Sequence, residues 1–157
     1  MNWISILVAA FVPITIGFFW YGDHLFGSIW MRESNLTKQS LEKDNILPIL
    51  TFVFLFSFFI AFMMQFIVIH QSGALGMIGG DVQKALPSYN VFMADYGTAF
   101  RTFKHGALHG TMSGILFAFP IVAINALFER KSWKLIFVHA GYWIVTLAIM
   151  GGAICGM

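Results

Sequence analysis

The sequence predicts an all-α integral membrane protein that crosses the bilayer four times. Of its 157 residues, 59% are apolar and only 10% are charged, whereas a soluble domain averages about 25% charged residues. Each of four apolar runs holds roughly the 20 residues that a helix needs to cross about 30 Å of hydrocarbon; they cover residues 3–21, 46–69, 105–128 and 133–155. They fill more than half of the chain, so we expect a single transmembrane domain over residues 1–157.

The runs are helical rather than strands of a membrane barrel. A barrel strand alternates apolar and polar residues over about ten positions, but TFVFLFSFFIAFMMQFIVI, residues 51–69, is apolar on every face. The first run is expected to be a retained span and not a signal peptide. No Lys or Arg precedes it, and it ends in Trp20 and Tyr21 with no small-residue cleavage site.

The basic residues favour one orientation. The segment of residues 22–45 and the turn that joins the last two runs together carry six Lys and Arg, counting Lys134 just beyond the turn, whereas residues 70–105 carry three. Because cytoplasmic loops are enriched in basic residues, this bias predicts that both termini lie outside. A net charge of +2 spread in this way does not indicate nucleic-acid binding. Cys155 is the sole cysteine, so no disulfide can form within one chain.

Both longer loops are expected to contain helical segments at the membrane surface. Aromatic rings favour the headgroup region, and the first loop begins with Trp20, Tyr21, Phe26 and Trp30, followed by a polar stretch that predicts a short solvated helix. The second loop spaces aromatic residues by three and four positions, which predicts an amphipathic helix on the membrane or one continuing into the third span; these residues are Tyr89, Phe92, Tyr96, Phe100 and Phe103.

Two stretches resemble a known family. The aromatic turn WYGDHLFGSIWM and the segment ALFERKSWKLIFVHAGYWIVTLAIMGG are similar to the bacterial membrane family labelled domain of unknown function 1761, over nearly the whole chain. The matching positions are Trp20, Tyr21, Gly27, Trp30, Phe128, Gly141 and Tyr142. The resemblance implies a four-span protein of the bacterial inner membrane, and it implies no activity, substrate or catalytic residue.

The turn at residues 129–132 is so short that the third and fourth spans must form an antiparallel hairpin. Counting from that turn at about 1.5 Å per residue, His139 lies level with Val122 and roughly 20 Å from His109, so it cannot share a ligand with His109. The count predicts one polar group at each face of the membrane. One comprises Asp23, His24 and His139, and the other comprises His70, His105 and His109, with Asp81 and Asp95 overhead.

The second group is a candidate metal site. His105 and His109 project from one helix face because they are four residues apart, and His70 from another helix would complete a three-nitrogen site like that of catalytic zinc. No His-Glu-x-x-His base accompanies them, and the sequence does not identify a cofactor.

The same stretch also favours close helix packing. Gly106, Gly110 and Gly114 repeat every four residues, the pattern that allows two membrane helices to approach closely. The seam has two possible partners: another subunit, or the small residues of the fourth span, which are Gly141, Ala148, Gly151, Gly152 and Gly156. Pro120 is expected to kink the third span, because its ring removes one backbone hydrogen bond.

Three functions remain open. The leading hypothesis is an interaction module that packs through the glycine seam, as a homo-oligomer or with a membrane partner subunit in the lipid bilayer. The second is a binding or transport protein for a small molecule, a lipid or an ion, with a histidine-lined pocket. The third, a metal-dependent membrane enzyme, is less favoured because the sequence shows no nucleophile, paired carboxylates or cofactor fingerprint.

Overall fold

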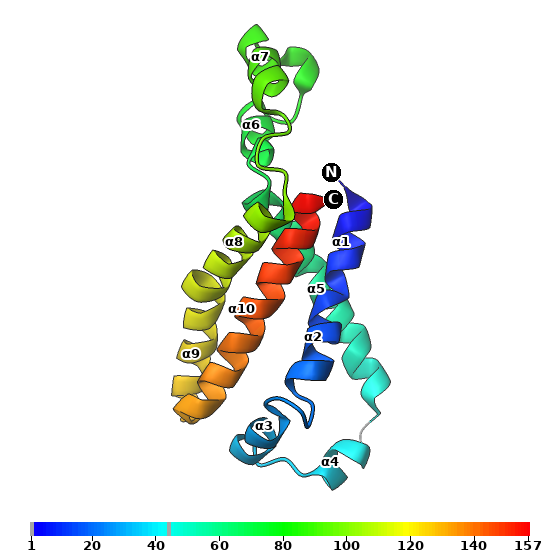
Figure 1. Cartoon of the computed structure of the whole chain (residues 1–157), viewed down its shortest axis with the longest axis vertical. Coiled ribbons are helices and arrows are strands. Elements are labelled where there is room, and N and C mark those ends of the chain that lie inside the picture. The colour runs from blue at the N-terminus through cyan, green and yellow to red at the C-terminus, as the bar shows by residue number, and fades with distance from the viewer. Residues whose placement is uncertain (1, 44) are drawn as a thin grey trace.

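The computed structural model describes residues 2–43 and 45–157. In this part of the chain four helices are long and apolar enough to cross a membrane, namely Trp3–Trp20, Ile46–Val68, Phe103–Phe128 and Trp133–Gly156. No strand occurs in the described ranges. The predicted fold class is therefore confirmed, and the four spans lie in one bundle (Figure 1).

The first span is divided into α1 (Trp3–Ala10) and α2 (Val12–Trp20). Asn2 caps α1, because its side chain accepts hydrogen bonds from the backbone N–H groups of Ile4 and Ser5. The division follows from Pro13, which sits in the first turn of α2 and has no N–H to continue the bonding of α1. The sequence prediction of one uninterrupted helix over residues 3–21 thus missed this break.

The bundle core lies where α1, α5 (Ile46–Val68) and α10 (Trp133–Gly156) meet. It is built from aliphatic side chains and methionines, namely Ile6, Ala9, Ala61, Met64, Val68, Leu147, Met150 and Ile154. Of the four spans, α10 is the most buried, since 56% of its apolar window is covered by the rest of the protein. The other three spans therefore pack around α10 and leave their outer faces to lipid.

The third span comprises α8 (Phe103–Ser113), the π-helical segment Gly114–Ala118 and α9 (Phe119–Phe128), and it forms the predicted hairpin with α10. Pro120 lacks the N–H that would bond to the carbonyl of Leu116, and the wider π turn directly precedes it. The structure thus shows a local change of helical pitch beside Pro120, where the sequence predicts a kink.

The glycine seam of α8 faces α10. A Cβ added at Gly106 would overlap the backbone of Gly151, and one added at Gly110 would overlap the backbone of Leu147. At Gly114 it would lie 2.6 Å from the Cα of Ile144. The sequence left the partner of these glycines open between the hairpin neighbour and another subunit, and in the structure they pack against α10 of the same chain.

The loops also contain helices, as predicted. At the end of the bundle that holds the α9–α10 turn, here called the hairpin end, lie α3 (Gly27–Glu33) and α4 (Lys38–Lys43). At the opposite end, called the termini end, α6 (Gln71–Met77), a short 3-10 turn (Val82–Lys84) and α7 (Pro87–Tyr96) form an arm that extends beyond the bundle along its long axis (Figure 1).

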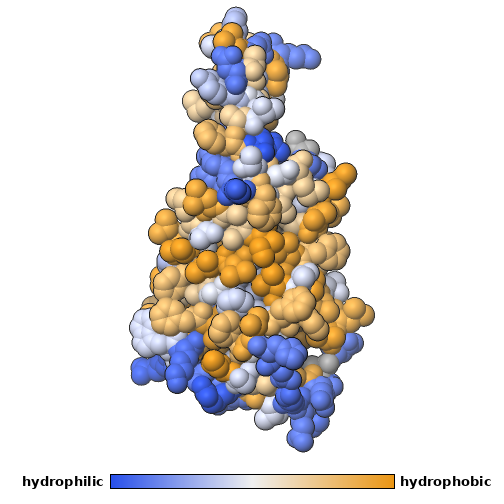
Figure 2. Space-filling model, in the orientation of Figure 1, coloured by the Kyte–Doolittle hydropathy of each residue, from blue (hydrophilic) through white to orange (hydrophobic). Residues whose placement is uncertain are grey.

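The sequence allows the aromatic helix of the second loop either to lie on the membrane or to continue into the third span. It does not continue, because residues 97–102 form a turn and a cap between α7 and α8. The molecular surface divides accordingly. On the face shown in Figure 2, apolar residues form a band across the middle of the bundle, hydrophilic residues gather at the hairpin end and at the base of the arm, and the arm itself is mixed.

Candidate metal site

Three histidines converge at the termini end, where α5 ends and α8 begins. His70 occupies the break between α5 and α6, and His105 and His109 lie one turn apart on α8. Thr102 fixes the start of α8, because its hydroxyl accepts a hydrogen bond from the backbone N–H of His105. Side chains from two helices are thereby brought to one point, as the sequence spacing predicts.

The imidazole rings are close enough to share one ion. The Nε2 atoms of His70 and His105 are 2.9 Å apart, a hydrogen bond between the two rings. The ring centroids are separated by 4.9 Å for His70 and His109 and by 4.5 Å for His105 and His109. One ligand nitrogen from each residue lies within 4.8 Å of the other two.

This geometry is near that of a tetrahedral zinc site. With Zn–N distances of about 2.0–2.1 Å, two ligand nitrogens of a tetrahedral ion lie about 3.3 Å apart. The His70 and His105 nitrogens would have to separate by a few tenths of an ångström, and that of His109 would have to approach.

Phe100 covers the cluster from the arm side. Its ring stacks on His105 at a centroid distance of 5.0 Å and meets His70 edge-on at 6.1 Å. Its backbone φ is +61°, a left-handed conformation that is uncommon for a bulky residue. The carbonyl of Phe100 accepts hydrogen bonds from the backbone N–H of Thr102 and from the Cys155 thiol, and these bonds hold the turn in place.

The cluster has few supporting groups. In the described part of the chain, no carboxylate joins the three histidines in the group of ligand atoms. Asp81, expected overhead, instead forms an ion pair with Lys84 at 3.0 Å. Arg101 turns away and donates to the carbonyl of Cys155. Among the described residues the site therefore offers three imidazole nitrogens, with no carboxylate base in the same group.

At the hairpin end, His139 and Asp23 have separate partners and do not form the polar group that the sequence predicts. His139 is half-buried, and its Nδ1 lies 2.8 Å from the hydroxyl of Tyr21. Asp23 pairs with Lys38 at 2.8 Å, and this hydrogen bond lowers the pKa of the Asp23 carboxyl. Burial raises the pKa of the Tyr21 phenol, so it remains protonated. The sequence predicts Tyr21 to lie at the headgroup region, and it does not predict the contact of Tyr21 with His139.

The aromatic residues after the first span form a packed cluster against α10. The indole N–H of Trp20 donates to the carbonyl of Val138 at 2.9 Å, and its ring covers Gly141, where a Cβ would lie 2.9 Å from it. The hydroxyl of Tyr142 donates to the carbonyl of Pro13. This cluster holds α2 against α10, so its role in the molecule is structural.

These contacts involve most of the positions that carried the family resemblance. Tyr21 packs on Trp30 and on Tyr142, with centroid distances of 5.2 Å in both cases. A Cβ at Gly27 would lie 2.5 Å from the carbonyl of Tyr21, so the backbone approach there requires glycine. Phe128 differs, because it is 87% exposed.

Comparisons with known proteins agree with the resemblance. A family model described as "Protein of unknown function (DUF1761)" matches residues 4–155. Searches of curated proteins and of solved structures both returned no significant match.

Proposed function

The chain belongs to the DUF1761 family, whose function is unknown, and from this premise we propose that it binds a divalent transition metal ion through His70, His105 and His109. One observation carries the proposal: ligand nitrogens of three histidines from two helices lie within 4.8 Å of one another. Imidazole nitrogen suits Zn²⁺, Cu²⁺ and Ni²⁺, and Zn²⁺ is the ion for which the three-nitrogen site with an open position is best known.

Binding is favoured over catalysis. A hydrolytic zinc site needs a base near its metal-bound water, and the described surroundings of the three histidines provide none. Metal ligands in strong sites usually donate their second ring nitrogen to a carboxylate or carbonyl. In the described part of the chain these three rings make no such bond, and their ring hydrogen bond joins His70 to His105. We therefore expect reversible binding of moderate affinity.

The interaction role derived from the glycine seam has weaker support. Gly106, Gly110 and Gly114 are covered by α10 of the same chain, so a second copy would have to use another surface. The charge bias of the loops favours an orientation with the termini end outside. In a bacterial inner membrane with that orientation, the proposed site would exchange metal with the external side.

The test is a metal titration of the purified protein in detergent. Wild type is expected to bind one Zn²⁺ per chain, measured by elemental analysis and by competition with a chelating dye. His105→Ala and His109→Ala should each lower the affinity at least about tenfold, the loss of one of three ligands. His24→Ala is the matched control, because His24 is exposed and lies at the hairpin end. Equal binding by all variants, or no bound metal in wild type, would exclude the site.

A further inference from the structure

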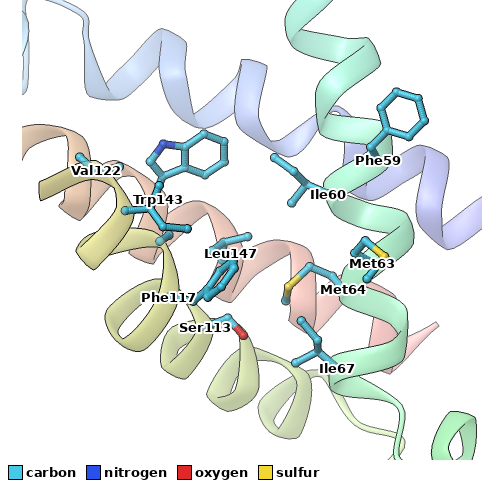
Figure 3. Close-up of a pocket in the computed structure, with 12 residues that line it drawn as sticks. Phe59, Ile60, Met63, Met64, Ile67, Ser113, Phe117, Val122, Trp143 and Leu147 are labelled. Carbon is cyan, nitrogen blue, oxygen red and sulfur yellow. The ribbon is translucent and has the colours of Figure 1, made fainter. Parts of the chain in front are cut away.

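An apolar cavity of about 500 Å³ opens between α5 and the third span, with α10 as its floor. Figure 3 shows Met63, Met64 and Ile67 on one wall, Phe117 on the other, and Trp143 with Leu147 between them. None of the described side chains fills this cavity. Because the surrounding helices are membrane spans, the cavity lies at the depth of the hydrocarbon.

The wall formed by the third span is irregular where it borders the cavity. Phe117 and Ala118 belong to the π-helical segment, and Ser113 directly precedes it. Single π turns inside α-helices are rare and occur frequently at functional sites. The segment therefore marks this face of the span as more than ordinary lipid-facing surface.

A second cavity of about 320 Å³ lies at the hairpin end, and it is more polar than the first. Asn125, Glu129, Lys131 and His139 are among the residues that line it. Since one acidic and one basic side chain stand on its rim, it presents both signs of charge within one site.

The two cavities are adjacent. Val122 and Trp143 line both of them. From Val122 to Ser113 the apolar cavity follows the span over roughly 14 Å, close to the depth of hydrocarbon in one leaflet, about 15 Å. A volume of several hundred Å³ is also within the range of small-molecule sites, about 300–1,000 Å³. The combined shape fits a molecule with a polar head and a long apolar tail.

His139 can supply a hydrogen-bond donor to such a head. Its Nδ1 lies 2.8 Å from the Tyr21 hydroxyl, in a hydrogen bond to which either group can donate. With Nδ1 accepting, the neutral ring carries its proton on Nε2, which points in a different direction from Nδ1. His139 can thus donate a hydrogen bond into the polar cavity that it lines.

We propose that the two adjacent cavities together bind one zwitterionic phospholipid. Its phosphate accepts hydrogen bonds from Lys131, Asn125 and His139, its ammonium group faces Glu129, and one acyl chain lies along the apolar cavity. A lipid held only by annular contact would not need paired charges at the head. This site is at the opposite end of the molecule from the three histidines, so it stands independently of the metal proposal.

The test is lipid analysis of protein purified in mild detergent. Mass spectrometry of the extracted lipid should find about one zwitterionic phospholipid per chain. Val122→Trp should remove it by blocking the junction of the cavities, whereas Ile124→Trp, on the exposed side of the same helix, should retain it. Equal retention by both variants, no bound lipid, or a bound amphiphile without phosphate would overturn the proposal.

The head is tested with exposed residues, whose substitution leaves the fold intact. Glu129→Gln removes the partner of the ammonium group, so the preference for zwitterionic over anionic phospholipid should fall about tenfold, the effect of one charge-assisted hydrogen bond. Lys131→Gln should weaken retention of both lipids. Arg130→Gln, between the two, is the control that should change neither. A wild-type preference for anionic phospholipid would also overturn the proposal.

Discussion

The Nε2 atoms of His70 and His105 lie 2.9 Å apart, joined by a hydrogen bond that a metal ion would have to break. In that bond one ring donates its Nε2 proton and the other accepts it. A metal requires a bare nitrogen on both rings, so its binding releases or moves this proton. Metal binding should therefore be weaker in acid, where protons compete for the same nitrogens.

Phe100 is expected to matter more for metal binding than for stability. Phe100→Gly relieves a left-handed backbone that costs a non-glycine residue roughly 1–2 kcal/mol, but it also uncovers His105. The melting temperature should stay unchanged or rise, while Zn²⁺ affinity falls several-fold in the dye competition. Arg130→Gly is the control, because Arg130 has a φ of +56° at the hairpin end. A parallel change of affinity in both variants would contradict the role of Phe100.

Gly110 should tolerate no side chain. Gly110→Ala places a methyl group against the backbone of Leu147 and should lower the free energy of unfolding by about 1–3 kcal/mol through overpacking. Gly76→Ala is the matched control, since nothing lies within 4 Å of a Cβ at that helical position. Thermal unfolding in detergent measures both, and similar melting temperatures for the two would show that α8 and α10 are less closely packed than described.

Tyr21→Phe should destabilise the protein at neutral pH by about 1 kcal/mol, the net value of one hydrogen bond, because His139 loses the hydroxyl 2.8 Å from its Nδ1. Tyr96→Phe, on the exposed arm, is the control. Burial raises the pKa of Tyr21, so its stabilising effect is complete below the ordinary tyrosine pKa of about 10. The effect declines as the pH rises from there toward the raised value.

The difference in melting temperature between wild type and Tyr21→Phe should accordingly be constant from neutral pH to about 9 and then shrink. Spectrophotometric titration of the phenols gives the same information independently. A difference that grows in alkali would contradict the buried, protonated state of Tyr21.

The orientation of the spans can be tested with single cysteines. Gln83→Cys, on the arm, should react with a membrane-impermeant thiol reagent in intact cells, and Ser40→Cys, on α4, should react only after the cells are opened. Both positions are exposed, and the native Cys155 is buried. The reverse pattern would place both termini inside and show that six basic residues against three do not determine the topology.

The sequence predicted the spans and the hairpin because their signals are local. Apolar length defines each span, and the short turn at residues 129–132 requires an antiparallel pair. Counting residues from that turn also separated His139 from the His105 and His109 pair correctly. In the structure His139 contacts Tyr21 at the hairpin end, while the pair lies at the termini end.

The remaining contacts depend on packing between segments far apart in the chain. Tyr21 and His139 are 118 positions apart, and no periodicity links them, so each was assigned to a different environment. The break at Phe11 was missed because an apolar run shows length but not hydrogen bonding, although Pro13 marks the place. The choice of α10 as partner of the glycine seam depends on the approach of two backbones, which a spacing pattern alone does not determine.

The position of the three histidines has a consequence for biosynthesis. His105 and His109 lie on α8, which is held by its contact with α10 through Gly106 and Gly110. In the order of translation α10 follows α8, so the ribosome delivers the ligand-bearing helix before the helix that fixes its place. We expect the arrangement of the three rings to become fixed once the hairpin has closed in the bilayer, so that metal reaching the nascent chain earlier meets a less ordered set of ligands.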